Sequence, residues 1–305
     1  MTTFPTSNPS SEQAPDARRG LRTFMVRGHM KSGTNWVCAL LNLHPEICCV
    51  GEFHFERLRQ AFDDFADRPW MVEGFEAARQ LGREAVDRFA VRCLEMAAES
   101  KPGAKLVGDR TPAPLGDEIP DSPIIHITRD GRDVLVSWAY HTLRLGRPAA
   151  HPEIERWRLE RLDKLETMPD TPEQLLDDET IVRMRARRWS KVVLGDLEWI
   201  RNSSKGESSN PVLAINYETL HNNVDAARRE MYRFLGVDPG KAAPVSTESL
   251  TTAGFGDRAE DPTNFYRAGK VGQWKRYFSD QTKKWFQEEA GQALIAAGYE
   301  HDLNW

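Results

Sequence analysis

Short apolar runs alternate with longer amphipathic stretches from residue 21 to the end of this 305-residue chain. Each short run ends at glycine or polar residues, which is typical of buried strands; they cover residues 21–26, 48–52, 105–108, 124–128 and 212–215. Apolar residues at helical spacing predict helices between the strands, over about residues 36–43, 56–100, 130–145, 176–200, 224–235 and 283–297. Strands that alternate with helices predict an α/β fold, with a central parallel sheet of about five strands and helices on both faces.

The length is sufficient for one large α/β domain, which we place at residues 21–305. Residues 1–20 are rich in Ser, Pro and Thr and lack an apolar core, so we expect a disordered leader that is neither a signal peptide nor a membrane anchor. Residues 147–175 contain four prolines and many charges, which predicts a mobile lid or insertion.

The overall charge argues against one broad class of function. Charged residues make up 29% of the chain and its net charge is −5, so a general nucleic-acid binder is disfavoured and any site for a polyanion must be local. No run approaches the roughly 18 apolar residues that a membrane span needs, which predicts a soluble, cytoplasmic protein. The four cysteines show no CxxC spacing, so we expect free thiols and neither a disulfide framework nor a metal site. The oligomeric state is left open.

The junction of the first strand and first helix has the composition of a phosphate site. Glycines, hydroxyls and a lysine occupy residues 28–35, where the first N–H groups of a helix lack intrahelical partners. The nucleotide-triphosphatase loop GxxxxGK[ST] places its lysine directly after the second glycine. Here Thr34 follows Gly33, and Lys31 comes two residues earlier. The alternative is an ordinary turn with a solvated lysine.

Polar residues also follow other predicted strands. Lys31, Glu52, Asp109 and Arg129 all fall at the carboxyl ends of strands. Parallel sheets bind ligands beyond this edge, so the pattern predicts one shared site there.

Residues 29–36, HMKSGTNW, resemble the YPKSGTTW signature of sulfotransferases that use 3′-phosphoadenosine 5′-phosphosulfate (PAPS). The resemblance implies a P-loop-like sulfotransferase fold in which Lys31 touches the 5′-phosphosulfate. It further implies that the phosphate is cradled by the next residues and that the adenine lies near Trp36; the cradle is Ser32, Gly33, Thr34 and Asn35.

Two further segments resemble the motifs that bind the cofactor's 3′-phosphate. Residues 125–137 are similar to VxRNPxDxxVSxxxF, which implies phosphate contacts from Arg129 and Ser137. From spacing alone, Arg129 could instead pair with Asp133, and Ser137 could simply pack in its helix.

Residues 265–275 resemble the loop RKGxxGDWKNxF, which implies that Arg267, Ala268 and Gly269 close over the same phosphate. Ala268 replaces the lysine of that motif, so one contact is either lost or supplied by Lys270. Tyr217 lies in a segment similar to YEDL, whose tyrosine sits near the cofactor.

The sequence offers more than one candidate for the general base of the transfer reaction. Family members that act on small molecules carry KTHLP, whereas residues 108–112 read GDRTP, without a histidine. This segment is more similar to the E-K-[ST]-P of carbohydrate sulfotransferases, which implies that Asp109 is the base, with Arg110 beside it. The alternatives are a structural Asp109–Arg110 pair, with His54 or, less favoured, Glu52 as the base.

The acceptor pocket is expected to be lined by Glu52, His141 and several aromatic side chains, namely Phe53, Phe55, Trp70 and Trp138, together with His54. The predicted function is in-line transfer of a sulfuryl group from PAPS to a hydroxyl or amine of a small-molecule or carbohydrate acceptor, without a metal. Two alternatives are a small-molecule kinase on a P-loop scaffold and a non-catalytic nucleotide-binding protein. The sequence does not identify the acceptor, nor does it separate O- from N-sulfation.

Overall fold

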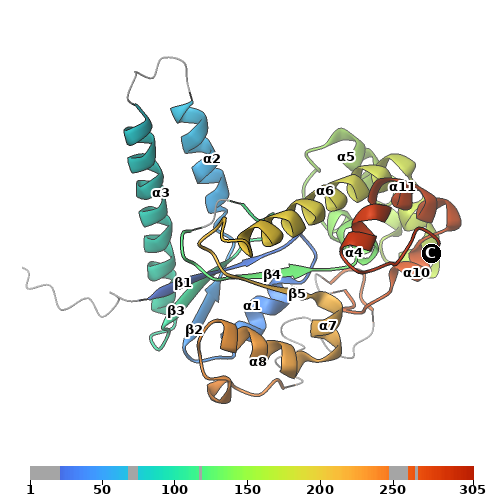
Figure 1. Cartoon of the computed structure of the whole chain (residues 1–305). Helices are drawn as coiled ribbons and strands as arrows, with labels where there is room; N and C mark the ends of the chain where they lie inside the picture. The colour runs from blue at the N-terminus through green and yellow to red at the C-terminus, as the bar shows by residue number, and fades with distance from the viewer. Residues whose placement is uncertain (1–20, 68–74, 117–118, 247–259, 265–266) are drawn as a thin grey trace, which may run out of the picture.

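The computed structural model describes residues 21–67, 75–116, 119–246, 260–264 and 267–305 (Figure 1). The expected leader at residues 1–20 and Trp70 lie outside this part of the chain.

Five parallel strands form one sheet in the order β2-β3-β1-β4-β5. All five predicted strands are found, with ends shifted by at most two residues, and the predicted parallel sheet is confirmed. The strands are β1 (Arg22–Arg27), β2 (Ile47–Val50), β3 (Leu106–Arg110), β4 (Ile124–Thr128) and β5 (Val212–Asn216). The central strands β1, β3 and β4 bury most of their residues, whereas the edge strand β5 is partly exposed.

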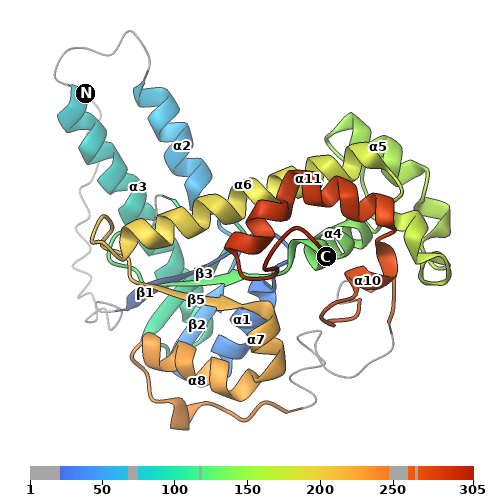
Figure 2. The same cartoon turned by 45° about the vertical axis from the view of Figure 1, so that its right-hand side comes forward.

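Alternate side chains of β1 enter different cores, as the two-residue period of a strand requires. Phe24 and Val26 pack toward α1 (Thr34–Asn42), α7 (Tyr217–Asn222) and α8 (Val224–Phe234). Met25 faces the opposite core, which includes Leu94 of α3. Both views show α1, α7 and α8 on one side of the sheet and α3 on the other (Figures 1 and 2). The predicted helices on both faces are confirmed.

The single helical stretch expected over residues 56–100 is divided. α2 (Phe55–Ala66) and α3 (Phe75–Ala97) run antiparallel and project from the sheet, and a 3₁₀ helix (Ala98–Ser100) follows (Figure 1). Pro69 and Gly74 fall between the two helices in the sequence, and both residue types disfavour a helix interior. Arg59 on α2 pairs with Asp87 on α3, which ties the two helices together.

A second group of helices lies at the end of the sheet toward which the strands point (Figures 1 and 2). It contains α4 (Gly131–Leu143), α5 (Pro152–Leu159), α10 (Trp274–Tyr277) and α11 (Asp280–Ala296), with α11 packed along α6 (Glu179–Ser203). Three short 3₁₀ helices follow α5, namely Leu162–Lys164, Met168–Asp170 and Pro172–Leu176. A fourth, Pro239–Lys241, follows α8.

Residues 147–175, the segment expected to be a mobile lid or insertion, contain regular structure and buried side chains. They contain α5, and the side chains of Trp157, Met168 and Leu175 have no exposed surface. Trp157 stacks on Trp138 of α4, with ring centroids 5.5 Å apart. Burial of these large apolar groups attaches the segment to the core. The expectation that it acts as a lid or insertion stays a prediction. Within the described residues, no helix is both long and apolar enough to span a membrane.

Candidate functional site

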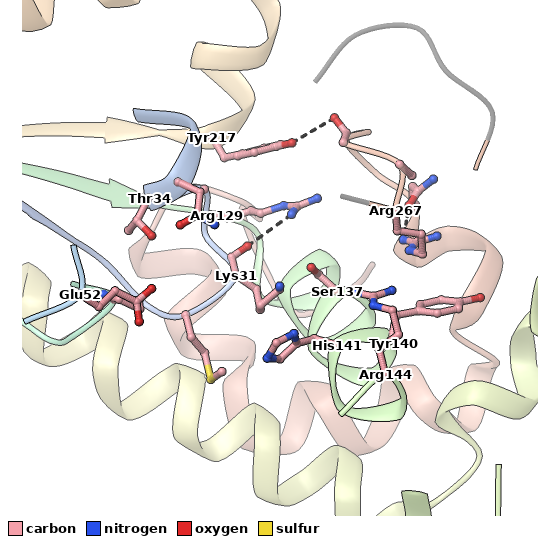
Figure 3. A pocket seen from close by; sticks show the side chains of 17 residues that line it. Lys31, Thr34, Glu52, Arg129, Ser137, Tyr140, His141, Arg144, Tyr217 and Arg267 are labelled. Carbon is pink, nitrogen blue, oxygen red and sulfur yellow. Dashed lines mark hydrogen bonds between the residues drawn. The ribbon is translucent and has the colours of Figure 1, made fainter. Parts of the chain in front are cut away.

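A cavity of about 270 Å³ lies between the carboxyl ends of the strands and helix α4 (Figure 3). Residues from widely separated segments line it: Met30, Lys31, Gly33, Thr34, Asn35, Glu52, Pro112, Arg129, Ser137, Tyr140, His141, Arg144, Tyr217, Arg267, Ala268, Gly269 and Gln273.

The loop from β1 to α1 forms one wall of this cavity. Lys31 has a φ of 69°, an uncommon conformation for a residue other than glycine. Gly33 is the N-cap of α1 with a φ of 105°, and a Cβ there would lie 2.7 Å from the Tyr217 ring. The glycine thus lets the loop pass close to that ring, and the first N–H groups of α1 lack intrahelical partners. This is the geometry of an anion-binding helix N-terminus.

Arg129, directly after β4, is held by the elements around it. Its Nη1 donates to the carbonyl of Lys31 at 3.3 Å and its Nη2 to that of Lys270 at 3.0 Å. The guanidinium lies 4.1 Å from the centre of the Tyr217 ring. Its buried Nε has no hydrogen-bond partner among the described residues. Arg129 is therefore fixed in place with one donor still to satisfy.

The segment from Arg267 to Trp274 is fastened across the cavity by two residues of the main body. The carboxylate of Asp133 on α4 accepts hydrogen bonds from the N–H of Gly272 at 2.7 Å and of Trp274 at 2.9 Å. The Tyr217 hydroxyl donates to the carbonyl of Gly269 at 3.0 Å. A segment distant in sequence is thereby positioned opposite the β1–α1 loop.

Arg267 is buried in this segment. It pairs with Glu260, donates to Gln273 and lies 4.4 Å from the centre of the Tyr140 ring. Burial lowers the pKa of Arg267. Its packing between aromatic rings and a carboxylate orients the guanidinium at the edge of the cavity.

One face of α4 supplies the opposite wall. Ser137, Tyr140, His141 and Arg144 follow helical spacing and all line the cavity (Figure 3). Burial lowers the pKa of His141 to about 4, and the charges of Lys31 and Arg144 act in the same direction. This imidazole is therefore neutral at pH 7.

The charges in the cavity are mostly positive. Burial, together with the charges of Arg144 and Arg129, lowers the pKa of Lys31 to about 8, and the charge of Glu52 opposes this shift. Positive groups that depress one another's pKa would be stabilised by an anion placed between them. The arrangement suits a ligand that carries several negative charges.

Comparison with known proteins agrees with this chemistry. The family model described as the sulfotransferase domain matches residues 21–297.

The chain belongs to this sulfotransferase family.

Solved structures similar to this sulfotransferase-family chain include two sulfotransferases and a retinol dehydratase. Mouse sulfotransferase SULT7A1 complexed with PAP is 16% identical, with a TM-score of 0.44 over 90% of this chain and 84% of that one. Retinol dehydratase in complex with androsterone and inactive cofactor PAP is 18% identical, with a TM-score of 0.43 over 90% and 81%. A sulfotransferase from Alicyclobacillus acidocaldarius is 15% identical, with a TM-score of 0.35 over 76% and 90%. A comparison with curated protein sequences finds no match.

Most of the residues expected at the sulfotransferase site meet in this cavity. Those that line it are Lys31, Gly33, Thr34, Asn35, Glu52, Arg129, Ser137, His141, Tyr217, Arg267, Ala268 and Gly269. Their roles stay predictions, but three sequence motifs and the end of β2 do converge.

Several other expected residues lie behind the lining. Ser32 is fully buried, and its hydroxyl has no hydrogen-bond partner among the described residues. Trp36 is 2% exposed and packs on Tyr217, with ring centroids 5.4 Å apart. Trp36 therefore packs against Tyr217 and does not itself line the cavity.

The aromatic acceptor pocket expected from the sequence is not assembled by these residues. Phe53 stacks on Phe55 with ring centroids 4.9 Å apart, and neither lines the cavity. Phe55 belongs to the core beside α3, and Trp138 is buried against Trp157. Which side of its element each ring occupies depends on packing with distant segments, which the local sequence does not specify.

Asp109 is also placed differently from its expected role as a base. Its carboxylate is completely buried and does not line the cavity. Oδ2 lies 3.0 Å from Nη1 of Arg27, the Thr111 hydroxyl donates to Oδ2 at 2.8 Å, and the N–H of Phe53 donates to Oδ1 at 3.2 Å. An acceptor could not reach this carboxylate without breaking these bonds. The ion-pair partner of Asp109 in the structure is Arg27 and not Arg110, and the role of Asp109 as the base stays a prediction that its burial does not favour.

Glu52, unlike Asp109, is a carboxylate that lines the cavity. It follows β2, lines the cavity and pairs with Arg110, the residue expected beside Asp109. Residues 109 and 110 are neighbours in β3 and so point to opposite faces. His54 lies outside the lining; its Nε2 is 3.5 Å from Glu52 and its Nδ1 is 2.9 Å from Glu56.

Five lining residues were not anticipated: Met30, Pro112, Tyr140, Arg144 and Gln273. Tyr140 and Arg144 follow Ser137 at helical spacing, a signal that was available in the sequence. In contrast, Lys270, the expected substitute for the missing motif lysine, is exposed and contributes its carbonyl. Among the described residues, no group of three or more His, Cys, Asp or Glu side chains could hold a metal.

Proposed function

We propose that this protein transfers the sulfuryl group of PAPS to a hydroxyl or amine of a small-molecule or carbohydrate acceptor. The main support for the proposal is the set of residues that line the cavity. It combines Lys31, Arg129 and Arg267 with Ser137 on one side and the carboxylate of Glu52 on the other. Membership of the sulfotransferase family supports the same reaction class.

The residues present fit such a cofactor. The Nε of Arg129 and the hydroxyl of Ser32 are buried polar groups without a hydrogen-bond partner in the part of the chain that the structure describes, and they lie close to a helix N-terminus that favours phosphate. In the proposed arrangement, the 5′-phosphosulfate is held by Lys31 and the residues up to Asn35. The 3′-phosphate is held by Arg129, Ser137 and the segment from Arg267 to Gly269. PAPS would supply an activated sulfuryl group and a phosphate leaving group.

The chain's own groups then divide the work of the displacement. The ammonium of Lys31 offsets negative charge that develops on the departing phosphate. Arg129 and Tyr217 keep the carbonyl of Lys31, and hence this loop, in a fixed position. Glu52 accepts the proton of the attacking hydroxyl or amine. We prefer Glu52 to Asp109 and His54 because of the three it alone lines the cavity in the described part of the chain.

The cofactor assignment is tested by calorimetric binding of 3′-phosphoadenosine 5′-phosphate (PAP) and of ATP with magnesium. We expect tight binding of PAP that Arg129→Ala weakens strongly. A preference for ATP would favour the kinase alternative, and binding of neither would favour a protein without this activity.

The base assignment is tested with PAPS and a panel of phenols, alcohols, amines and sugars, with PAP release as the readout. Glu52→Gln should lower kcat by about 10²–10⁴-fold and leave the Kd of PAP unchanged, because it removes a proton acceptor and no phosphate contact. Glu56→Gln is the matched control, since Glu56 contacts His54 and does not line the cavity. Normal turnover of Glu52→Gln would exclude this residue as the base.

A further inference from the structure

The cavity contains a cation that the three sequence motifs do not include. Arg144, at the C-terminal end of α4, lines the cavity together with Lys31, Arg129 and Arg267. It follows Ser137 by two helical turns, so the hydroxyl and the guanidinium come from the same face of α4. Figure 3 shows Ser137 and Arg144 on the cavity side of the helix, with Arg267 facing them from the opposite segment.

Arg144 has its charge only partly offset by protein groups, and among carboxylates Asp261 acts to raise its pKa. Its Nη1 donates to the carbonyl of Pro262 at 2.8 Å, a neutral acceptor. No ion pair to Arg144 is found within the described residues, whereas Arg267 has Glu260 and Arg132 has Asp130. A half-buried guanidinium in this situation favours an external anion.

Arg144 also lies within the field of the other cations of the site. Burial lowers the pKa of Arg144 to about 10, and among charged groups Arg267 contributes most to the decrease. Arg144 is in turn the charge that most lowers the pKa of Lys31. Because these like charges repel, an anion bound between Arg144 and Arg267 would relieve an existing electrostatic cost.

The segment from Arg267 to Trp274, which lies opposite α4, has no positive charge at the position after Arg267. Ala268 is 4% exposed and provides no charge, and the side chain of Lys270 is exposed outside the lining. A second cation beside Arg267 is therefore supplied by the helix and not by the loop.

We propose that Arg144 binds the 3′-phosphate of the cofactor together with Arg267 and Ser137. This inference rests on the proposed function, and it adds a phosphate ligand from outside the three motifs. It makes recognition of the 3′-phosphate depend on the C-terminal turn of α4.

The test compares PAP with adenosine 5′-phosphate, which lacks the 3′-phosphate, by calorimetry on the full chain. Arg144→Gln should weaken PAP by about 10–100-fold, as expected for loss of a charge-assisted hydrogen bond, and change the affinity for adenosine 5′-phosphate by less than about twofold. Arg144→Lys should recover part of the loss because it retains the charge. Arg147→Gln is the matched control, since Arg147 is exposed and lies outside the lining.

Unchanged PAP affinity in Arg144→Gln would overturn the inference and point to an anionic acceptor as the partner of Arg144. Equal weakening of both nucleotides would also overturn it, because it would indicate a structural effect transmitted through Pro262. If the unmodified protein does not prefer PAP to adenosine 5′-phosphate, the proposed cofactor fails and the inference fails with it. The preference of the unmodified protein for PAP over adenosine 5′-phosphate therefore distinguishes failure of the proposed cofactor from failure of the Arg144 assignment alone.

Discussion

The affinity for PAP should depend on the protonation of Lys31. Burial and neighbouring positive charges lower the pKa of this lysine from 10.5 to about 8 in the free protein. A bound phosphosulfate or phosphate would favour the charged form and raise the pKa again. Binding should therefore take up a proton above pH 8, and affinity should fall as the pH rises through that value.

The size of this effect follows from linkage. If the bound anion restores the ordinary pKa of 10.5, affinity should be about tenfold weaker at pH 9 than at pH 7, where Lys31 is mostly protonated. The limiting loss at higher pH would be about 300-fold, or about 3.4 kcal/mol at 1.36 kcal/mol per pH unit. A range of pH 7–9 avoids titration of Arg144, whose pKa is about 10, and of His141, whose pKa is about 4.

Calorimetry of PAP binding in buffers of different ionisation enthalpy measures both the affinity and the number of protons taken up. Lys31→Arg is the control, because arginine stays charged throughout this range, so its affinity should be nearly constant. A flat profile for the unmodified protein, or the same fall in Lys31→Arg, would refute the reasoning.

Two further substitutions test the parts of the structure that hold the site. Asp109→Asn should destabilise the fold by about 3–5 kcal/mol in urea unfolding, because it leaves Arg27 as an uncompensated buried charge, while the folded fraction binds PAP normally; a folded, stable variant that had lost only turnover would restore Asp109 as the base. Gly33→Ala should weaken PAP by at least about tenfold in the same calorimetric assay, since φ is 105° and the new Cβ would meet the Tyr217 ring at 2.7 Å. Gly146→Ala, where nothing lies within 4 Å of the new Cβ, should bind PAP normally, and equal effects at both glycines would argue against the steric explanation.

The sheet was predictable because its signal is local. Each of the five strands is a short apolar run with its own end, so even β5 (Val212–Asn216) was found from a few residues. Packing between distant segments gives no such local signal. Residues 147–175 have the composition of a loose loop, but Trp157 and Trp138 come together from different helices and bury the segment.

The convergence of several motif residues on the cavity was predictable for a similar reason. Lys31 and Gly33 lie in one short motif, and Arg129 and Ser137 lie in another, so their relative positions follow from a strand end and the helix after it. The base was not predictable in this way. Glu52 and Asp109 are both carboxylates just beyond or at a strand end, and nothing in their local sequence states which one reaches the cavity.

The amino-acid sequence by itself determined the five strands, most of the helices and the glycine-containing turn between β1 and α1, because each is encoded within a few consecutive residues. It also contains the three segments that resemble sulfotransferase motifs. The tertiary structure decided which side chains meet across segments. Arg27 from β1 neutralises Asp109 on β3, Glu52 is left at the cavity, and Arg144 is brought opposite Arg267. These outcomes depend on how distant elements pack, since burial and charge pairing are set by neighbours that are remote in the chain.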